Sequence, residues 1–121
     1  MKIKISTRVV LIFKDYVLKF PVSLRGHLQC IQEKYIWEKY HNTGLLGELI
    51  SYKYGIIKMK KYNPCESIDF LKVMDAKKII KEFDFKYCDL YNYKNWGKSE
   101  DGKIILIDYG INEDISKMYN I

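Results

Sequence analysis

The most informative part of this chain is the stretch Asp89-Leu-Tyr-Asn-Tyr-Lys-Asn-Trp-Gly97, which is followed by Asp101-Gly-Lys-Ile-Ile-Leu-Ile-Asp-Tyr-Gly110. It places Asp89 and Asn95 in a polar loop, then a buried strand, and then Asp108 at the end of that strand. Carboxylate and amide oxygens are the ligands that Mg²⁺ prefers, and a loop Asp can accept a proton from an attacking hydroxyl. The pattern therefore predicts a magnesium–phosphate site, with Asn95 and Asp108 as metal ligands and Asp89 as the catalytic base.

The length and charge of the chain limit the classes of protein to consider. With 121 residues and 48% hydrophobic content, the chain is expected to form one globular domain. Lys and Arg number 21 against 15 Asp and Glu, a net charge of +6 that can attract nucleic acid, an acidic protein or nucleotide phosphates. All but two of the basic residues are Lys, in a chain also rich in Ile, Tyr and Asn. The bias of an A·T-rich genome explains this charge better than a polyanion-binding surface does.

The cysteines and the N-terminal segment argue against a zinc protein and a membrane protein. The three cysteines are isolated, and together with only two histidines they form no convincing zinc site. We expect buried free thiols in a reducing compartment. The apolar run at residues 9–13 is too short for a signal sequence or a membrane span, so the expected location is the cytoplasm, with no membrane partner.

Hydrophobic periodicity predicts an α+β fold, because strands come first and a helix-rich part follows. In the helix expected at residues 24–40, the apolar residues Leu28, Ile31 and Tyr35 recur at helical spacing and are expected to be buried. The other predicted elements are short strands near residue 4 and at 9–13, 16–20, 45–52 and 55–59, a turn at Asn63-Pro64, a helix at 67–83, a strand at 103–108 and a short tail at 111–121.

The loop, strand and terminal Asp resemble the catalytic loop and the metal-binding Asp-Phe-Gly motif of the protein kinase-like superfamily, with Tyr109 in the place of Phe. The resemblance extends to the N-terminal half. Asp15-Tyr-Val-Leu-Lys19 looks like the strand that carries the phosphate-binding Lys of these proteins, and residues 25–37 resemble the following helix of small kinase-like proteins of bacteriophages and prophages.

This resemblance implies both a fold and a set of roles. The fold would be a truncated kinase-like domain, with a small antiparallel N-lobe sheet and one helix at 1–63 and a reduced C-lobe at 64–121. ATP and Mg²⁺ would be the cofactors. Lys19 would hold the phosphates, and Glu33 on the helix would orient Lys19, with Glu38 as the alternative because one sequence does not fix the helix register.

Several departures from the kinase pattern bear on activity. The interval from Asp89 to Asn95 is one residue longer than usual, and Tyr87-Cys88 replaces the usual His-Arg pair. No Gly-rich phosphate loop precedes Lys19, so the backbone N–H groups of such a loop are missing. Only 11 residues follow Gly110, which implies no activation segment.

Three functions therefore stay open. The first is a phage-type kinase-like protein in the host cytoplasm that binds ATP–Mg²⁺, with or without phosphoryl transfer. The alternative is a catalytically inactive pseudokinase that engages a host or viral protein. A second alternative is a nucleic-acid binder that uses an aromatic and basic stripe, formed by Tyr52-Lys-Tyr54 and Lys58-Met-Lys-Lys-Tyr62.

Overall fold

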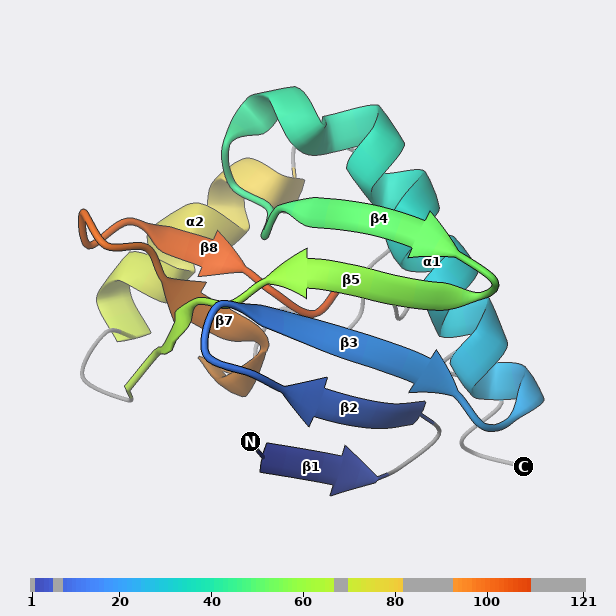
Figure 1. Cartoon of the computed structure of the whole chain (residues 1–121). Helices are drawn as coiled ribbons and strands as arrows, with labels where there is room; N and C mark the ends of the chain where they lie inside the picture. Colours follow the sequence, from blue (N-terminus) through green and yellow to red (C-terminus); the bar gives the residue numbers. More distant parts are fainter. Residues whose placement is uncertain (1, 6–7, 67–69, 82–92, 110–121) are drawn as a thin grey trace.

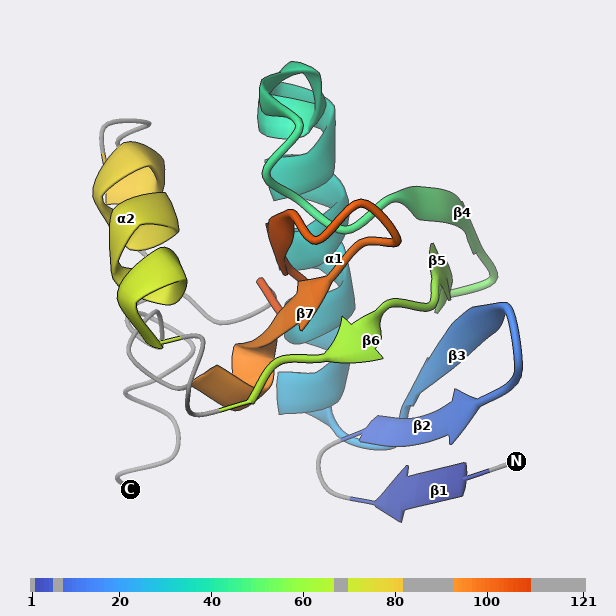
Figure 2. The same cartoon turned by 90° about the vertical axis from the view of Figure 1, so that its left-hand side faces the viewer.

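The protein has an α+β fold, and its described residues form two antiparallel sheets and two α-helices (Figure 1). The computed structural model describes residues 2–5, 8–66, 70–81 and 93–109. The larger sheet has five strands in the order β1-β2-β3-β5-β4, and helix α1 covers one of its faces. The smaller sheet has three strands in the order β6-β7-β8 and lies between the larger sheet and helix α2 (Figure 2).

The larger sheet follows the β-branched and aromatic runs of the N-terminal half, which favour pleated strands. The strand pairs expected around Lys14-Asp15 and before Asn63 are confirmed, but residues 45–48 lie outside β4. In the tight turn between β4 and β5, Tyr54 and Gly55 have φ angles of 54° and 77°. The strands are β1 (Lys2–Ile5), β2 (Arg8–Ile12), β3 (Tyr16–Pro21), β4 (Leu49–Lys53) and β5 (Ile56–Lys60).

The register of this sheet decides which side chains face the core. Lys19 lies opposite Val10 on β2 and opposite Ile57 on β5. Directly paired residues share a face of the sheet, and residues two apart on one strand also share it. Ile57 and Met59 are buried, so the face that carries Lys19 is the core face. Arg8, two residues before Val10, lies on the same face.

Helix α1 (Leu24–Tyr40) begins and ends where the sequence predicts. The Ser23 side chain caps its first turn by accepting a hydrogen bond from the Gly26 N–H at 3.1 Å, and Gly44 (φ 72°) follows the short 3₁₀ helix η1 (His41–Thr43). The expected buried face is wrong, because Ile31 and Tyr35 are 44% and 54% exposed. The buried residues are Gly26, Gln29, Cys30, Glu33, Ile36 and Tyr40.

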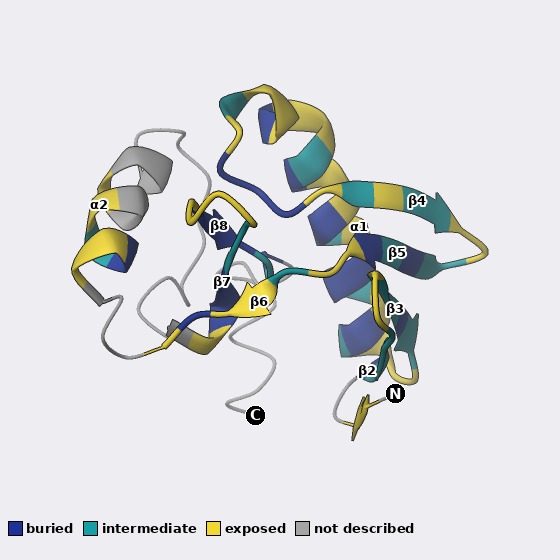
Figure 3. Cartoon of the chain, turned by 60° about the vertical axis from the view of Figure 1, so that its left-hand side comes forward, coloured by how far each residue is buried: buried dark blue, intermediate teal, exposed yellow. Residues whose placement is uncertain are grey.

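Polar residues on the inner face explain this error. Gln29 and Glu33 are buried, so the apolar periodicity of α1 does not mark the side that packs on the sheet. Figure 3 shows the buried positions of α1 turned toward the strands.

The smaller sheet contains two strands that the sequence did not predict. Asn63 and Pro64, expected as a turn, form the short strand β6 and pair with β7. β7 (Trp96–Lys98) pairs with β8 (Ile104–Leu106), which is shorter than the expected strand at 103–108. The predicted helix at 67–83 is found as α2 (Phe70–Lys81), and the rest of that range, like the tail at 111–121, lies outside the described residues.

One core joins the two sheets. The Gly47 N–H donates to the Leu106 carbonyl and the Leu106 N–H donates to the Leu45 carbonyl, each at 2.8 Å, so the segment before β4 is hydrogen-bonded to β8. Ile57, Ile36, Trp96 and Leu106 are fully buried in the same cluster. The end of β8 is thereby held close to β3 and α1. Neither described helix is both long and apolar enough to cross a membrane.

Candidate functional site

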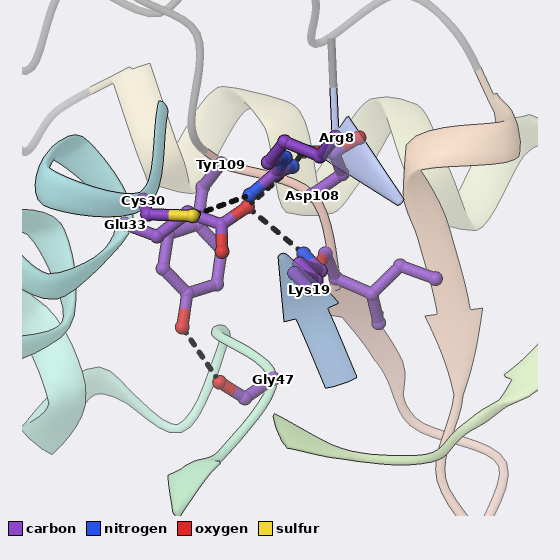
Figure 4. A network of polar contacts seen from close by, with 8 residues as sticks. Arg8, Lys19, Cys30, Glu33, Gly47, Asp108 and Tyr109 are labelled. Atoms are coloured by element: carbon purple, nitrogen blue, oxygen red, sulfur yellow. Dashed lines mark hydrogen bonds and ion pairs between the residues drawn. The ribbon is translucent and has the colours of Figure 1, made fainter. Parts of the chain in front are cut away.

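Lys19 and Glu33 form an ion pair between the larger sheet and α1 (Figure 4). Lys19 Nζ lies 2.8 Å from Glu33 Oε1, and the two residues are only 6% and 0% exposed. The register of β3 turns Lys19 toward the core, and the middle of α1 brings Glu33 over it. The structure also decides between the two glutamates considered, because Glu38 is on the exposed side of α1 and pairs with Lys34 at 3.7 Å.

Arg8, at the start of β2, completes this cluster and was not predicted. Arg8 Nη2 lies 3.1 Å from Glu33 Oε1 and 3.4 Å from Asp108 Oδ1, and Nη1 contacts Cys30 Sγ at 3.8 Å. Arg8 is only 5% exposed. Burial by itself lowers the pKa of Arg8, but the charges of Glu33 and Asp108 outweigh it and raise the pKa above its ordinary value. Arg8 is therefore permanently charged.

A signal for Arg8 was present in the sequence. It is one of only two arginines, it begins an otherwise apolar strand, and strand alternation places it on the same face as Lys19. Buried arginines are rare unless they are paired, so a core-facing Arg predicts nearby carboxylates.

Asp108 and Asn95 meet at the open end of the β7–β8 hairpin, opposite its turn. The Asn95 carbonyl accepts hydrogen bonds from the N–H groups of Ile107 at 2.8 Å and Asp108 at 3.3 Å. Lys19 Nζ also donates to the Ile107 carbonyl at 3.4 Å. The main chains of the two predicted metal ligands are thus adjacent, and the Lys19 ammonium lies beside the intervening Ile107 carbonyl. The Asn95 residue is buried, whereas the Asp108 side chain is 38% exposed.

Tyr109 stands in the core directly after Asp108. It is fully buried, and its hydroxyl donates to the Gly47 carbonyl at 2.9 Å. Burial raises the pKa of the Tyr109 phenol far above its ordinary value. Asp89, the predicted base, lies outside the described residues.

The cluster is electrically balanced. Arg8 and Lys19 carry two positive charges, and Glu33 and Asp108 carry two negative charges. Both cations share Glu33 Oε1, while Glu33 Oε2 is buried and has no hydrogen-bond partner among the described residues. Guanidinium and ammonium groups both bind phosphate oxygens, and Arg8 and Lys19 place one of each beside the partly exposed Asp108.

The donor atoms near Asp108 suit Mg²⁺, although one neighbouring charge opposes it. Mg²⁺ is usually bound by one or two carboxylates together with phosphate oxygens and waters. Asn95 and Asp108 could therefore supply the ligand atoms that come from the protein. Among the described residues no three His, Cys, Asp or Glu gather into a metal site. A divalent cation on Asp108 Oδ1 would lie within about 5.5 Å of the Arg8 guanidinium, where an effective dielectric of about 20 gives a repulsion of roughly 6 kcal/mol.

The aromatic and basic stripe predicted for nucleic acid is divided between the two faces of the larger sheet. Tyr52 pairs with Ile57 and packs against the core, while Lys58 lies on the opposite face. The Lys58 ammonium lies 4.6 Å from the centre of the Tyr16 ring, and Lys60 lies 5.7 Å from that of Tyr62. The role in nucleic-acid binding stays a prediction.

Comparisons of the chain with protein-family models, curated proteins and solved structures find no significant match. The site is therefore interpreted from its own geometry. Lys19, Glu33, Asn95 and Asp108 come together from three separate parts of the chain, and Arg8 joins them.

Proposed function

We propose that this protein is a kinase-like protein of the phage or prophage type that binds ATP together with Mg²⁺. The observation that carries the proposal is the buried contact of 2.8 Å between Lys19 Nζ and Glu33 Oε1. A Lys on a sheet and a Glu on the next helix were expected to pair for this function. Lys and Glu are both costly to bury. A buried Lys–Glu pair is therefore stronger support for a functional role than a solvated pair on the surface would be.

The arrangement of the elements supports the same proposal. A small antiparallel sheet with one helix comes first, and a hairpin that ends in Asp108 and Tyr109 closes against it. The resemblance implies this order for an N-lobe and the beginning of a C-lobe. The proximity of Asp108 to Glu33, through their shared contact with Arg8, adds a third part of the chain to the pair.

Each residue has a definite role in the proposed complex. The Lys19 ammonium would bind oxygens of the α- and β-phosphates, and Glu33 would keep Lys19 turned toward them. Asn95 and Asp108 would hold Mg²⁺, which, when bound, neutralises charge on the β- and γ-phosphates. The half-exposed Asp108 side chain is open to such a ligand from the solvent side.

Phosphoryl transfer is an extension of this proposal. It requires Asp89 to lie beside the attacking hydroxyl, and Asp89 lies outside the described residues. Only residues 6–7 separate β1 from β2, which leaves little room for a phosphate-covering loop. Loss of one well-placed stabilising group lowers a catalytic rate roughly 10²–10³-fold. The proposal is therefore nucleotide binding, and catalysis is its extension.

Isothermal titration with ATP, in the presence and absence of MgCl₂, tests the proposal. The wild type is compared with Lys19→Met and with the matched control Lys34→Met, in which a half-exposed Lys on α1 is replaced. We expect Lys19→Met to weaken binding at least tenfold and Lys34→Met to leave it unchanged. Absence of binding by the wild type, or equal binding by Lys19→Met, would refute the proposal. Circular dichroism verifies that each variant is folded.

A second candidate function is that of an inactive, kinase-derived binding protein. The observation that favours it is the balanced cluster, in which Arg8 forms ion pairs with both Glu33 and Asp108 and so neutralises charge that a metal ion would otherwise meet. This candidate predicts one stoichiometric partner from host lysate, whose binding is insensitive to Asp89→Ala and Asp108→Ala. Loss of that partner in folded variants would count against it.

A further inference from the structure

We infer that Arg8 is the resident counter-ion of Asp108, and that a divalent cation binds Asp108 only by displacing Arg8. The inference rests on the proposed function and adds a gate to the same site, by which we mean that Arg8 controls access of a divalent cation to Asp108. The contact between Arg8 Nη2 and Asp108 Oδ1 at 3.4 Å carries it. A guanidinium and a divalent cation cannot both lie against one carboxylate oxygen without strong repulsion.

The contacts of Arg8 are unequal, which indicates where it would give way. The distance to Glu33 is shorter, 3.1 Å, and Glu33 is fully buried. The distance to Asp108 is longer, and the Asp108 side chain is 38% exposed. Of the four charged side chains in the cluster, Asp108 is the one that ions from solution reach. We therefore expect an incoming cation to break the Arg8–Asp108 contact and to leave the Arg8–Glu33 contact in place.

Lys19 does not take the place of Arg8 at this position. Its ammonium lies against Glu33 Oε1 at 2.8 Å and against the Ile107 carbonyl at 3.4 Å. Arg8 is the cation that lies within ion-pair distance of Asp108 in the described part of the chain. A change at Arg8 should thus alter the charge at Asp108 directly.

The same geometry gives the nucleotide a role in loading the metal. A guanidinium binds phosphate oxygens in a bidentate manner, so a polyphosphate offers Arg8 another partner when it leaves Asp108. Binding of metal and of phosphate would then be coupled, each making the other more favourable. The ligand class that fits this gate is a polyphosphate with a divalent cation, whereas the cation alone has to compete with Arg8.

The first test is a titration of the protein with MnCl₂ without nucleotide, in which electron paramagnetic resonance measures free Mn²⁺. Four proteins are compared: wild type, Arg8→Gln, the double variant Arg8→Gln/Asp108→Asn, and the control Arg25→Gln, which alters the second arginine of the chain. We expect Arg8→Gln to bind Mn²⁺ at least tenfold more tightly than wild type and Arg25→Gln to match wild type. The double variant should lose the gain.

Equal Mn²⁺ binding by wild type and Arg8→Gln would overturn the inference, as would a gain that persists in the double variant. Absence of measurable Mn²⁺ binding by a folded Arg8→Gln would overturn it too. These outcomes are distinct from those that refute the proposed function, which fails if wild type does not bind ATP or if Lys19→Met binds it equally well.

A second measurement needs no substitution and covers the case in which Arg8→Gln does not fold. The chain has two arginines, so the side-chain Nε–Hε region of a ¹⁵N-labelled sample holds two signals. With saturating MgCl₂ and ATP, we expect the Arg8 signal to shift and the Arg25 signal to stay. A stationary Arg8 signal in a sample that binds Mg²⁺–ATP would overturn the inference.

Discussion

The Tyr109 hydroxyl donates a hydrogen bond of 2.9 Å to the Gly47 carbonyl, and so links the segment after β8 to the segment before β4. Both partners are buried, and Tyr109 directly follows Asp108. A phenylalanine, which the kinase pattern has at this position, lacks this donor. The hydroxyl therefore anchors in the core the residue that directly follows Asp108.

Replacing Tyr109 with Phe tests how much this hydrogen bond contributes to the stability of the fold. The change leaves the ring in the core but deprives the buried Gly47 carbonyl of its donor, which should lower the free energy of unfolding by about 1–3 kcal/mol. Urea denaturation measures the change. The control is Tyr54→Phe, because Tyr54 is 98% exposed and its hydroxyl should contribute nothing measurable. A Tyr109→Phe variant as stable as wild type would show that the bond is not needed.

The stability of the protein should fall at alkaline pH. Burial raises the pKa of Tyr109 above its ordinary value of 10.0, so the folded state keeps the phenol protonated where the unfolded state loses the proton. This contribution is fully present below pH 10 and is lost as the pH rises further, at up to about 1.4 kcal/mol per pH unit. Burial also raises the pKa of the Cys30 thiol from 9.0, which adds a loss of the same sign.

Unfolding free energies measured between pH 8 and pH 11 test this expectation. Tyr109→Phe should show a shallower decline above pH 10 than wild type, while Tyr54→Phe should decline as wild type does. Parallel curves for Tyr109→Phe and wild type would contradict the assignment of this loss to Tyr109.

The two glutamates of α1 should respond very differently to the same substitution. Glu33→Gln leaves Arg8 and Lys19 buried without the carboxylate that both of them contact. Breaking a buried ion pair in this way lowers the free energy of unfolding by about 3–5 kcal/mol. Glu38→Gln removes a surface pair with Lys34 and should change stability by less than about 0.5 kcal/mol. Thermal and chemical denaturation of both variants measure the contrast. Similar stabilities would mean that the buried pair contributes no more than the exposed one.

The turn between β4 and β5 offers a stabilising change. Tyr54 has a φ of 54°, in the left-handed region that disfavours most residues other than Gly, Asn and Asp. Asn before Gly is the preferred pair for tight hairpin turns, so Tyr54→Asn should stabilise the protein by about 0.5–1 kcal/mol. A lower melting temperature for Tyr54→Asn would show that the exposed ring makes a contact worth more than the backbone strain.

Local patterns in the sequence were sufficient to predict most of the regular structure. The β-branched runs around Lys14-Asp15 and the Asn42-Thr-Gly44 stop signal predict β2, β3 and the end of α1, because these signals act over a few residues. Strand β6 was missed, since Asn63-Pro64 is a typical turn sequence and becomes a strand only by pairing with β7. Short strands of this kind depend on a partner distant in sequence, which local propensity does not contain.

The candidate site divides in the same way. The chemistry of Mg²⁺ ligands singled out Asn95 and Asp108 in the sequence, and the resemblance to the kinase-like superfamily singled out Lys19 and Glu33. The choice of Glu33 over Glu38 and the presence of Arg8 were decided by tertiary structure. Helix rotation and strand register determine which charges are buried together, and a buried charge must find its counter-ion among whatever side chains the packing brings within reach.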